Sequence, residues 1–214
     1  MRSRLWLIPF ALVVASPARA ATGSVAGKVT AGADSPFLWI VYLEGGAPPR
    51  PVAEGPPKEI LQEDVKFKPS VAYVALGTTL AFPNRDKFYH NAFSPTTGNQ
   101  FDLGLYRGGV TKSVTLRAPG EVDIYCNIHP DMYARVLVLP SSLYAEVASD
   151  GSYEVKGVPP GKYTVVAWSP RHQPQRQEVT VAAGRPATAT FSLRGRPFPS
   201  RHLNKNGEPY GRYK

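Results

Sequence analysis

The chain has 214 residues, of which 43% are hydrophobic and 19% charged, with 19 glycines and 22 prolines. The formal net charge is +9, but the excess of bases lies near the two ends and the body between them is nearly neutral. A basic face for nucleic acid would be spread over folded elements, so we expect no nucleic-acid partner. No stretch after the N-terminal segment reaches the ~18 apolar residues that a membrane-spanning helix needs.

The first 20 residues have the pattern of a secretory signal peptide. Arg2 and Arg4 precede an apolar run from Leu5 to Ser16, and Ala18-Arg19-Ala20 places small residues where a signal peptidase reads them. The run is too short for a spanning helix, although an N-terminal membrane anchor is the alternative. We therefore expect removal of residues 1–20 and a periplasmic or secreted protein.

The remainder predicts an all-β fold, because short runs with alternating apolar and polar residues are separated by glycine and proline. A weak helical candidate covers residues 57–63. Residues 21–63 are left open, either as an N-terminal extension or as extra strands of the first domain. The candidate strands of the first half are Ser24–Thr30, Phe37–Leu43, Asp64–Lys68, Val71–Val74, Thr79–Phe82, Thr111–Arg117, Glu121–Asn127 and Ala134–Leu139.

A second set of strands follows a junction at Leu139-Pro140-Ser141-Ser142. Turn signals at Asp150-Gly151 and Pro159-Pro160-Gly161 separate these strands. The candidates are Leu143–Val147, Gly151–Val155, Lys162–Trp168, Gln177–Val181 and Ala187–Leu193. We predict a small second sandwich at 141–194.

Residues 195–214 are rich in proline, glycine, asparagine and charge, which predicts a basic disordered tail. Its bases could make a weak electrostatic contact with envelope polymers or a membrane surface. A solvated tail without a partner is the alternative. His172 and His202 have no Cys, Asp or second His at ligand spacing, and we expect both at the surface.

The strongest functional signal is a set of four candidate metal ligands. Cys126 is the only cysteine, and His129 and Met132 follow it at i+3 and i+6, while His90 lies upstream. A lone cysteine cannot form a disulfide within the chain. One thiolate, two imidazoles and a thioether are the ligands of a type 1 copper site. Zinc also binds Cys and His, but the thioether favours one copper ion.

The residues around these ligands resemble the cupredoxins, including plastocyanin, pseudoazurin and amicyanin. The resemblance rests on residues 82–86, His90-Asn91, Pro119-Gly120 and Cys126-x-x-His129-x-x-Met132. A longer string through residues 101–104 also resembles plastocyanin-like bacterial proteins labelled "methylamine utilization protein". The likeness covers residues 66–139 and implies a Greek-key copper-binding sandwich.

The resemblance also implies a role for each matching residue. His90 would be the buried imidazole ligand, Cys126 the thiolate, His129 the ligand near the surface and Met132 the weak axial ligand. Asn91 would tie the two ligand loops together.

The second sandwich resembles the carboxypeptidase regulatory-like, or transthyretin-like, fold. Residues 150–153, 157–163 and 166–168 carry this likeness, which implies a structural or adhesive module without a catalytic group. The predicted domains are therefore a signal peptide at 1–20, a copper domain at 21–140, the sandwich at 141–194 and the tail at 195–214.

These features together predict an exported protein that transfers single electrons between redox partners and turns over no substrate. A partner of unknown identity would dock near His129, on a patch with Pro130, Tyr133 and Tyr106. The alternative is a copper-holding or adhesion module of the cell envelope. A copper enzyme would need an axial position without methionine, which Met132 opposes. The oligomeric state is not predicted.

Overall fold

The structure, a computed structural model, describes residues 21–31, 39–46, 51, 55–196 and 202–210. The predicted signal peptide lies outside these residues. All regular elements of the described residues are strands, which confirms the all-β fold class. Two short strands lie within residues 57–63, so the weak helical prediction there is wrong. No helix long and apolar enough to cross a membrane occurs in the described ranges.

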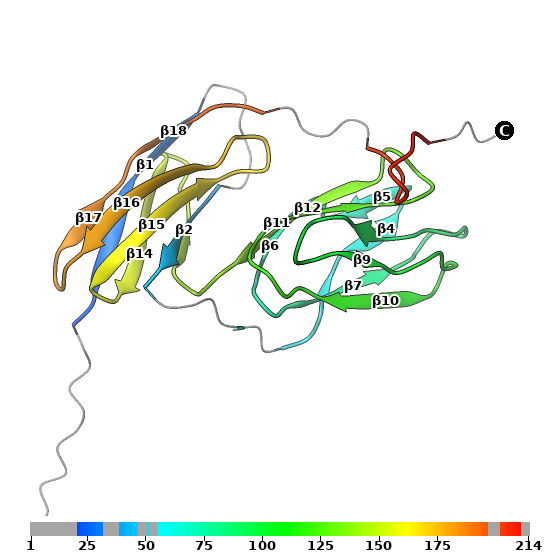
Figure 1. Ribbon diagram of the computed structural model, residues 1–214, viewed down its shortest axis with the longest axis horizontal. Coiled ribbons are helices and arrows are strands. Elements are labelled where there is room, and N and C mark those ends of the chain that lie inside the picture. The colour runs from blue at the N-terminus through cyan, green and yellow to red at the C-terminus, as the bar shows by residue number, and fades with distance from the viewer. Residues whose placement is uncertain (1–20, 32–38, 47–50, 52–54, 197–201, 211–214) are drawn as a thin grey trace, which may run out of the picture.

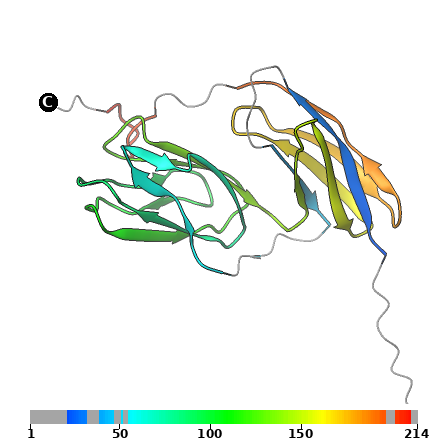
Figure 2. The same ribbon diagram turned by 180° about the vertical axis from the view of Figure 1, so that it is seen from behind.

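Two β-sandwiches lie side by side (Figures 1 and 2). We call the first the central sandwich, and it contains β3 to β12. Its five-stranded sheet has the order β6-β12-β11-β8-β9 and faces the three-stranded sheet β10-β7-β3 and the hairpin β4-β5. The strands are β3 (Lys58–Glu59), β4 (Leu61–Glu63), β5 (Lys66–Lys68), β6 (Val71–Ala75), β7 (Thr79–Pro83), β8 (Phe93–Ser94), β9 (Phe101–Asp102), β10 (Thr111–Thr115), β11 (Gly120–Tyr125) and β12 (Tyr133–Leu139).

The second, which we call the outer sandwich, combines the two ends of the chain. One sheet has the order β14-β1-β17, with β18 also paired to β1, and the other has the order β13-β2-β15-β16. The strands are β1 (Gly23–Ala31), β2 (Ile40–Gly45), β13 (Tyr144–Glu146), β14 (Ser152–Val158), β15 (Gly161–Trp168), β16 (Gln175–Val181), β17 (Pro186–Thr188) and β18 (Phe191–Leu193).

This pairing differs from the predicted domain boundaries. Strand β1 pairs with β14, β17 and β18, and β2 lies between β13 and β15, so both belong to the outer sandwich. Only β3 and β4 of the segment 21–63 join the central sandwich. In the chain, the central sandwich is thus inserted between strands β1 and β2 of the outer sandwich and its remaining strands, β13 to β18. Alternating strand patterns carry no information about which distant strand completes a sheet, so the nesting was not predicted.

Strand β12 links the two sandwiches because it is buried on both faces. Its seven residues are all buried, with Ala134, Val136 and Val138 in the central core. On the opposite face, Leu137 and Leu139 join an apolar cluster with β2 and β15 that includes Ile40, Tyr42, Val166 and Trp168. A continuous apolar run is the expected pattern for a strand covered on both sides. The cluster therefore makes the sandwiches one packed body.

Polar contacts at the same junction surround this cluster. Arg135 pairs with Asp123 at 2.7 Å and donates to the Pro170 carbonyl at 3.0 Å. The Trp168 indole donates to Glu121, which also pairs with Arg196. These bonds join β11 and β12 to the end of β15 and to the chain after β18, and they satisfy charges that packing has partly removed from water.

The described part of the C-terminal tail is ordered on the central sandwich, which contradicts the prediction of disorder for these residues. Residues 202–210, which we call the C-terminal segment, lie at the end of the central sandwich remote from the outer one (Figure 1). Composition favoured disorder because few of these residues are apolar, but the segment binds through hydrogen bonds to specific partners described below. The other predicted tail positions 197–201 and 211–214 lie outside the described residues.

Candidate metal centre

A short loop between two paired strands carries three of the predicted ligands. Tyr125 at the end of β11 pairs with Tyr133 at the start of β12, so residues 126–132 form a closed hairpin loop. Inside it, the Cys126 N–H donates to the Met132 carbonyl at 3.3 Å, and the Met132 N–H donates to the His129 carbonyl at 3.1 Å. These backbone bonds fix the loop before any metal is present.

His90 reaches the same place from a distant part of the chain. Its backbone exchanges two hydrogen bonds with Tyr106, with the His90 N–H at 3.0 Å and the Tyr106 N–H at 2.9 Å from their acceptors. Its side chain is fully buried. The position is therefore set by strand-like pairing and not by a flexible loop.

Three donor atoms converge at this point. The Nδ1 atoms of His90 and His129 lie 3.0 Å apart, and Cys126 Sγ lies 3.6 Å from His129 Nδ1. All three ligand atoms lie within 4.8 Å of one another. Donors bound to one ion at about 2.0–2.3 Å in a trigonal plane stand roughly 3.5–3.7 Å apart. The set therefore fits a single small metal ion with little rearrangement.

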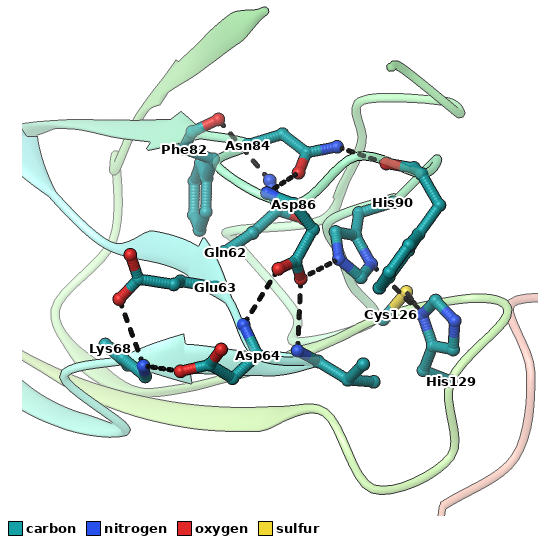
Figure 3. Close-up of polar contacts among 12 residues, drawn as sticks. Gln62, Glu63, Asp64, Lys68, Phe82, Asn84, Asp86, His90, Cys126 and His129 are labelled. Atoms are coloured by element: carbon teal, nitrogen blue, oxygen red, sulfur yellow. Dashed lines mark hydrogen bonds and ion pairs between the residues drawn. The ribbon is translucent and has the colours of Figure 1, made fainter. Parts of the chain in front are cut away.

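Asp86 fixes the orientation of the His90 ring. His90 Nε2 donates to Asp86 Oδ2 at 2.7 Å (Figure 3). With the proton held at Nε2, the Nδ1 lone pair points toward His129 and Cys126. A carboxylate behind a ligand imidazole fixes its tautomer and raises its basicity. The two imidazole nitrogens face each other beside the thiol, so a bound cation could accept electron pairs from all three atoms.

Backbone N–H groups of the turn between β4 and β5 hold the Asp86 carboxylate in place. The backbone N–H groups of Asp64 and Val65 donate to the two Asp86 carboxylate oxygens at 2.9 and 3.1 Å (Figure 3). Both turn residues have positive φ, 56° and 55°, which is unfavourable for a β-branched residue such as Val65. Burial acts to raise the pKa of the Asp86 carboxyl, but the hydrogen bonds from His90, Val65 and Asp64 together hold that pKa below its ordinary value.

A glycine allows the Asp86 loop to approach the strand region before β10. A Cβ on Gly108 would lie 2.0 Å from the Asp86 carbonyl oxygen, so a larger residue would push the loop away. The Gly109 N–H donates to the Asn84 carbonyl at 2.8 Å across the same contact. The position of Asp86 therefore depends on close backbone packing as well as on its own hydrogen bonds.

Burial controls the charge of the other two donors. It raises the pKa of the Cys126 thiol, while backbone N–H groups of Ile128, Asn91 and His129 act in the opposite direction. Burial also lowers the pKa of His129, and the neighbouring His90 lowers it further. The His129 ring is thus favoured in its neutral, ligand-competent form. A metal that binds here must displace the thiol proton.

Asn91 bridges the two ligand loops, the role that the resemblance implied for it. Its Oδ1 accepts the Asn127 N–H at 3.2 Å, and its Nδ2 donates to Asp102 at 2.7 Å. The side chain is buried, so its oxygen and its NH₂ group have protein partners in place of water. The bond ties the loop after His90 to the loop that starts at Cys126.

Met132 is fully buried in the same core cluster as Cys126. Its assignment as an axial ligand stays a prediction. The predicted docking patch needs correction, because Tyr133 and Tyr106 are both buried. Their hydroxyls donate to Asp123 at 2.6 Å and to the Phe82 carbonyl at 3.0 Å.

The exposed apolar side chains near the site are different ones. Phe88, Tyr89 and Leu105 have 46%, 55% and 53% of their surface exposed. The Phe88 ring stands edge-on to both imidazoles, with centroids 5.2 Å from His90 and 5.9 Å from His129. Sequence patterns did not identify these residues because exposure in a loop depends on the packing of its neighbours.

Asp86 was also missed, although its i, i+4 spacing to His90 was a usable signal. Neither remaining histidine is a freely exposed surface residue. His172 is buried, and its ring stands edge-on to that of Trp39 with centroids 6.0 Å apart. His202 is half-buried, with its ring centroid 4.2 Å from that of Tyr125. Each has found a tertiary partner that sequence spacing could not show.

Comparison with protein families gives one match. The model of the carboxypeptidase regulatory-like domain matches residues 130–194. This range covers β12 and the outer sandwich from β13 to β18, and it leaves out β1 and β2, which complete the same sheets. A search of curated proteins found no match.

Several solved structures resemble part of the chain. Copper-containing nitrite reductase from Thermus scotoductus is 28% identical with a TM-score of 0.36, covering 42% of this chain and 25% of that one. A purple cupredoxin from Nitrosopumilus maritimus is 20% identical with a TM-score of 0.34, covering 38% of this chain and 98% of that one. The reduced Cu(I) form of a mutant amicyanin is 18% identical with a TM-score of 0.37, covering 46% of this chain and 97% of that one.

The chain thus spans a quarter of the nitrite reductase but nearly the whole of the two smaller proteins. Residues 130–194 thus match the carboxypeptidase regulatory-like domain, and part of the chain is similar to the purple cupredoxin and to amicyanin.

Proposed function

We propose that the protein is an exported type 1 copper protein that carries single electrons between redox partners. The observation that supports this most is the convergence of His90 Nδ1, His129 Nδ1 and Cys126 Sγ within 4.8 Å of one another. Met132 lies buried in the same core. This donor set is soft, mixed and pre-arranged, which suits copper better than a hard cation.

Copper held by these residues would supply a Cu(I)/Cu(II) couple. The chain's own contribution is to keep the donors nearly fixed. Asp86 and the Tyr106 pairing hold His90, and the closed hairpin holds Cys126 and His129. A site that changes little between oxidation states exchanges electrons with a small rearrangement cost, and this is the use of a rigid scaffold.

Three of the four candidate donors are closed to water. His90, Cys126 and Met132 are each fully buried, and His129 is the most exposed of the four. We infer that the protein transfers electrons and is not itself an enzyme, because a methionine on the axial side would occupy the position that a substrate needs.

The docking surface is proposed at the Phe88, Tyr89 and Leu105 side chains. All three are exposed, and the Phe88 ring stands edge-on to His129. Tyr89 follows Phe88 in the chain, and Leu105 precedes Tyr106, whose backbone pairs with His90. A small apolar patch supports brief encounters between redox partners better than a permanent complex. We also propose that the protein is exported to the periplasm or beyond, where it meets a redox partner. The remaining bases of the tail would make a weak contact with an anionic surface.

The test is to purify the chain without residues 1–20, load it with copper and record its absorption and voltammetry. We expect a strong thiolate-to-copper band near ~600 nm and a reversible one-electron wave. Cys126→Ser is the control, and it should lose the band while it keeps the fold. A colourless oxidised protein would overturn the proposal.

The alternative, a copper-holding module, gives a different result in the same experiment. A holding site would keep Cu(I) tightly and resist oxidation by mild oxidants. A wave that cycles without metal loss supports the shuttle, and metal loss or the absence of a wave supports holding.

A further inference from the structure

The C-terminal segment, residues 202–210, lies directly against the loops that carry the candidate ligands. The Tyr210 hydroxyl donates to the Cys126 carbonyl oxygen at 2.5 Å, although 84 residues separate the two. The segment is drawn as the pale red ribbon beside the His129 loop (Figure 3). The contact is with the backbone of the ligand residue itself.

A closed ring of hydrogen bonds attaches the segment to both ligand loops. The Lys205 N–H donates to Asn127 Oδ1 at 2.9 Å, and Lys205 Nζ lies 2.7 Å from Asp102 Oδ2. Asn127 and Asp102 are both bound by Asn91, through its Oδ1 at 3.2 Å and its Nδ2 at 2.7 Å. Because the ring starts and ends at Lys205, no loop in it can move without breaking a bond elsewhere.

Aromatic packing completes the attachment. The His202 ring lies over Tyr125 with centroids 4.2 Å apart and 34° between the planes. The Tyr210 hydroxyl is 3.0 Å from His202 Nδ1. Tyr125 immediately precedes Cys126, so the segment covers the chain on both sides of the thiol residue.

We propose that the C-terminal segment is a clasp that holds the ligand loops in their metal-ready positions and slows metal loss. The effect on metal loss rests on the proposed copper site, whereas the stabilisation of the loops by the clasp does not require a metal. Tyr210 and Lys205 act as positioning residues, because they reach the donors only through the Cys126 carbonyl and through Asn127 and Asp102.

The physical reason is the cost of opening the hairpin loop. To release a metal, residues 126–132 must move away from His90, and with the clasp in place this motion also breaks the Tyr210 and Lys205 bonds. An internal hydrogen bond contributes enough to change an opening equilibrium roughly fivefold. The exposed Lys205–Asp102 ion pair adds less because water screens it.

The first test needs no metal and uses full-length variants. Tyr210→Phe removes one hydroxyl, and Tyr163→Phe is the matched control, because its hydroxyl donates to the Pro159 carbonyl at 3.0 Å in the outer sandwich. Hydrogen exchange of the Cys126, Asn127 and Met132 amides is measured in the metal-free protein. We expect about fivefold faster exchange in Tyr210→Phe and no change at these amides in Tyr163→Phe.

The double variant Lys205→Met/Tyr210→Phe extends this test, with Lys156→Met/Tyr163→Phe as its control. Lys156 pairs with Glu154 at 3.4 Å in the outer sandwich. Hydrogen exchange in the hairpin loop should be roughly tenfold faster or more in Lys205→Met/Tyr210→Phe and unchanged in its control. Equal exchange in the variant and its control would overturn the clasp.

The second test measures transfer of copper to a Cu(I) chelator in excess. We expect roughly five- to tenfold faster release from the clasp variants than from their controls. If the wild-type chain binds no copper but the amides still respond, the proposed function fails and the clasp stands. If the blue site forms and neither readout changes, the clasp alone fails.

Discussion

The two sandwiches differ in what their interiors contain. The core of the outer sandwich is almost wholly apolar, from Val25 on β1 to Leu193 on β18. The central sandwich buries His90, Asn84, Asn91 and Gln62 next to its apolar core. Buried polar groups cost stability unless each finds a partner. The central sandwich therefore buries more polar side chains than the outer one, including those around the candidate ligands, while the outer sandwich provides framework.

The largest expected effect comes from removing the thiol. Cys126→Ser should lower copper affinity by at least about three orders of magnitude and abolish the ~600 nm band, because a hydroxyl is a poor ligand for copper. His172→Gln is the control, since it alters a buried polar group of the outer sandwich. Competition titration measures both. If Cys126→Ser keeps its copper affinity, the central sandwich does not bind copper through this thiol and the functional distinction between the sandwiches is lost.

The junction between the sandwiches tests whether they behave as one body. Leu137→Ala removes a fully buried side chain from the cluster shared by β12, β2 and β15. It should destabilise the protein by about 3 kcal/mol and separate a single unfolding transition into two. Leu43→Ala, in the outer core alone, should cost a similar amount without the split. Calorimetry distinguishes the results, and a single transition in both would show that the apolar cluster is not what couples the sandwiches.

The Asp86 carboxylate that binds His90 allows the two sandwiches to be compared through a single side chain in each. Asp86→Asn should weaken copper binding about 10- to 100-fold, because the amide no longer accepts all three N–H groups and the His90 tautomer is no longer fixed. Asp150→Asn is the matched control, because Asp150 accepts the Ser152 N–H and hydroxyl in an outer-sandwich turn. That control should leave copper affinity unchanged. The idea fails if both variants bind copper as the wild type does.

The smallest effect is expected at the proposed docking patch. Leu105→Glu should slow electron self-exchange between oxidised and reduced molecules about tenfold, because like charges would meet at the patch. Leu203→Glu is a close control, since Leu203 is equally exposed, at 53%, on the C-terminal segment. NMR line broadening measures both rates. A larger effect at Leu203 would place the exchange surface on the clasp side.

Local pattern alone predicted many of the longer strands and the candidate donors. Alternation over runs such as 111–117 and 121–127 predicted β10 and β11, which end within two residues of the predicted positions. The unique Cys126 with His129 and Met132 at fixed spacing identified the hairpin loop. Both are short-range properties, because strand periodicity and ligand spacing within a loop are encoded in consecutive residues.

Only the tertiary structure decided which distant segments meet. Strand β1 pairs with β14, Asp86 holds His90 from the side opposite to the other donors, and Tyr210 reaches the Cys126 carbonyl. The sequence therefore determined an all-β chain with a candidate copper ligand set. Folding determined the nested sandwiches and the clasp, because contacts between remote residues depend on the packing of the whole chain and leave no periodic signal in a single sequence.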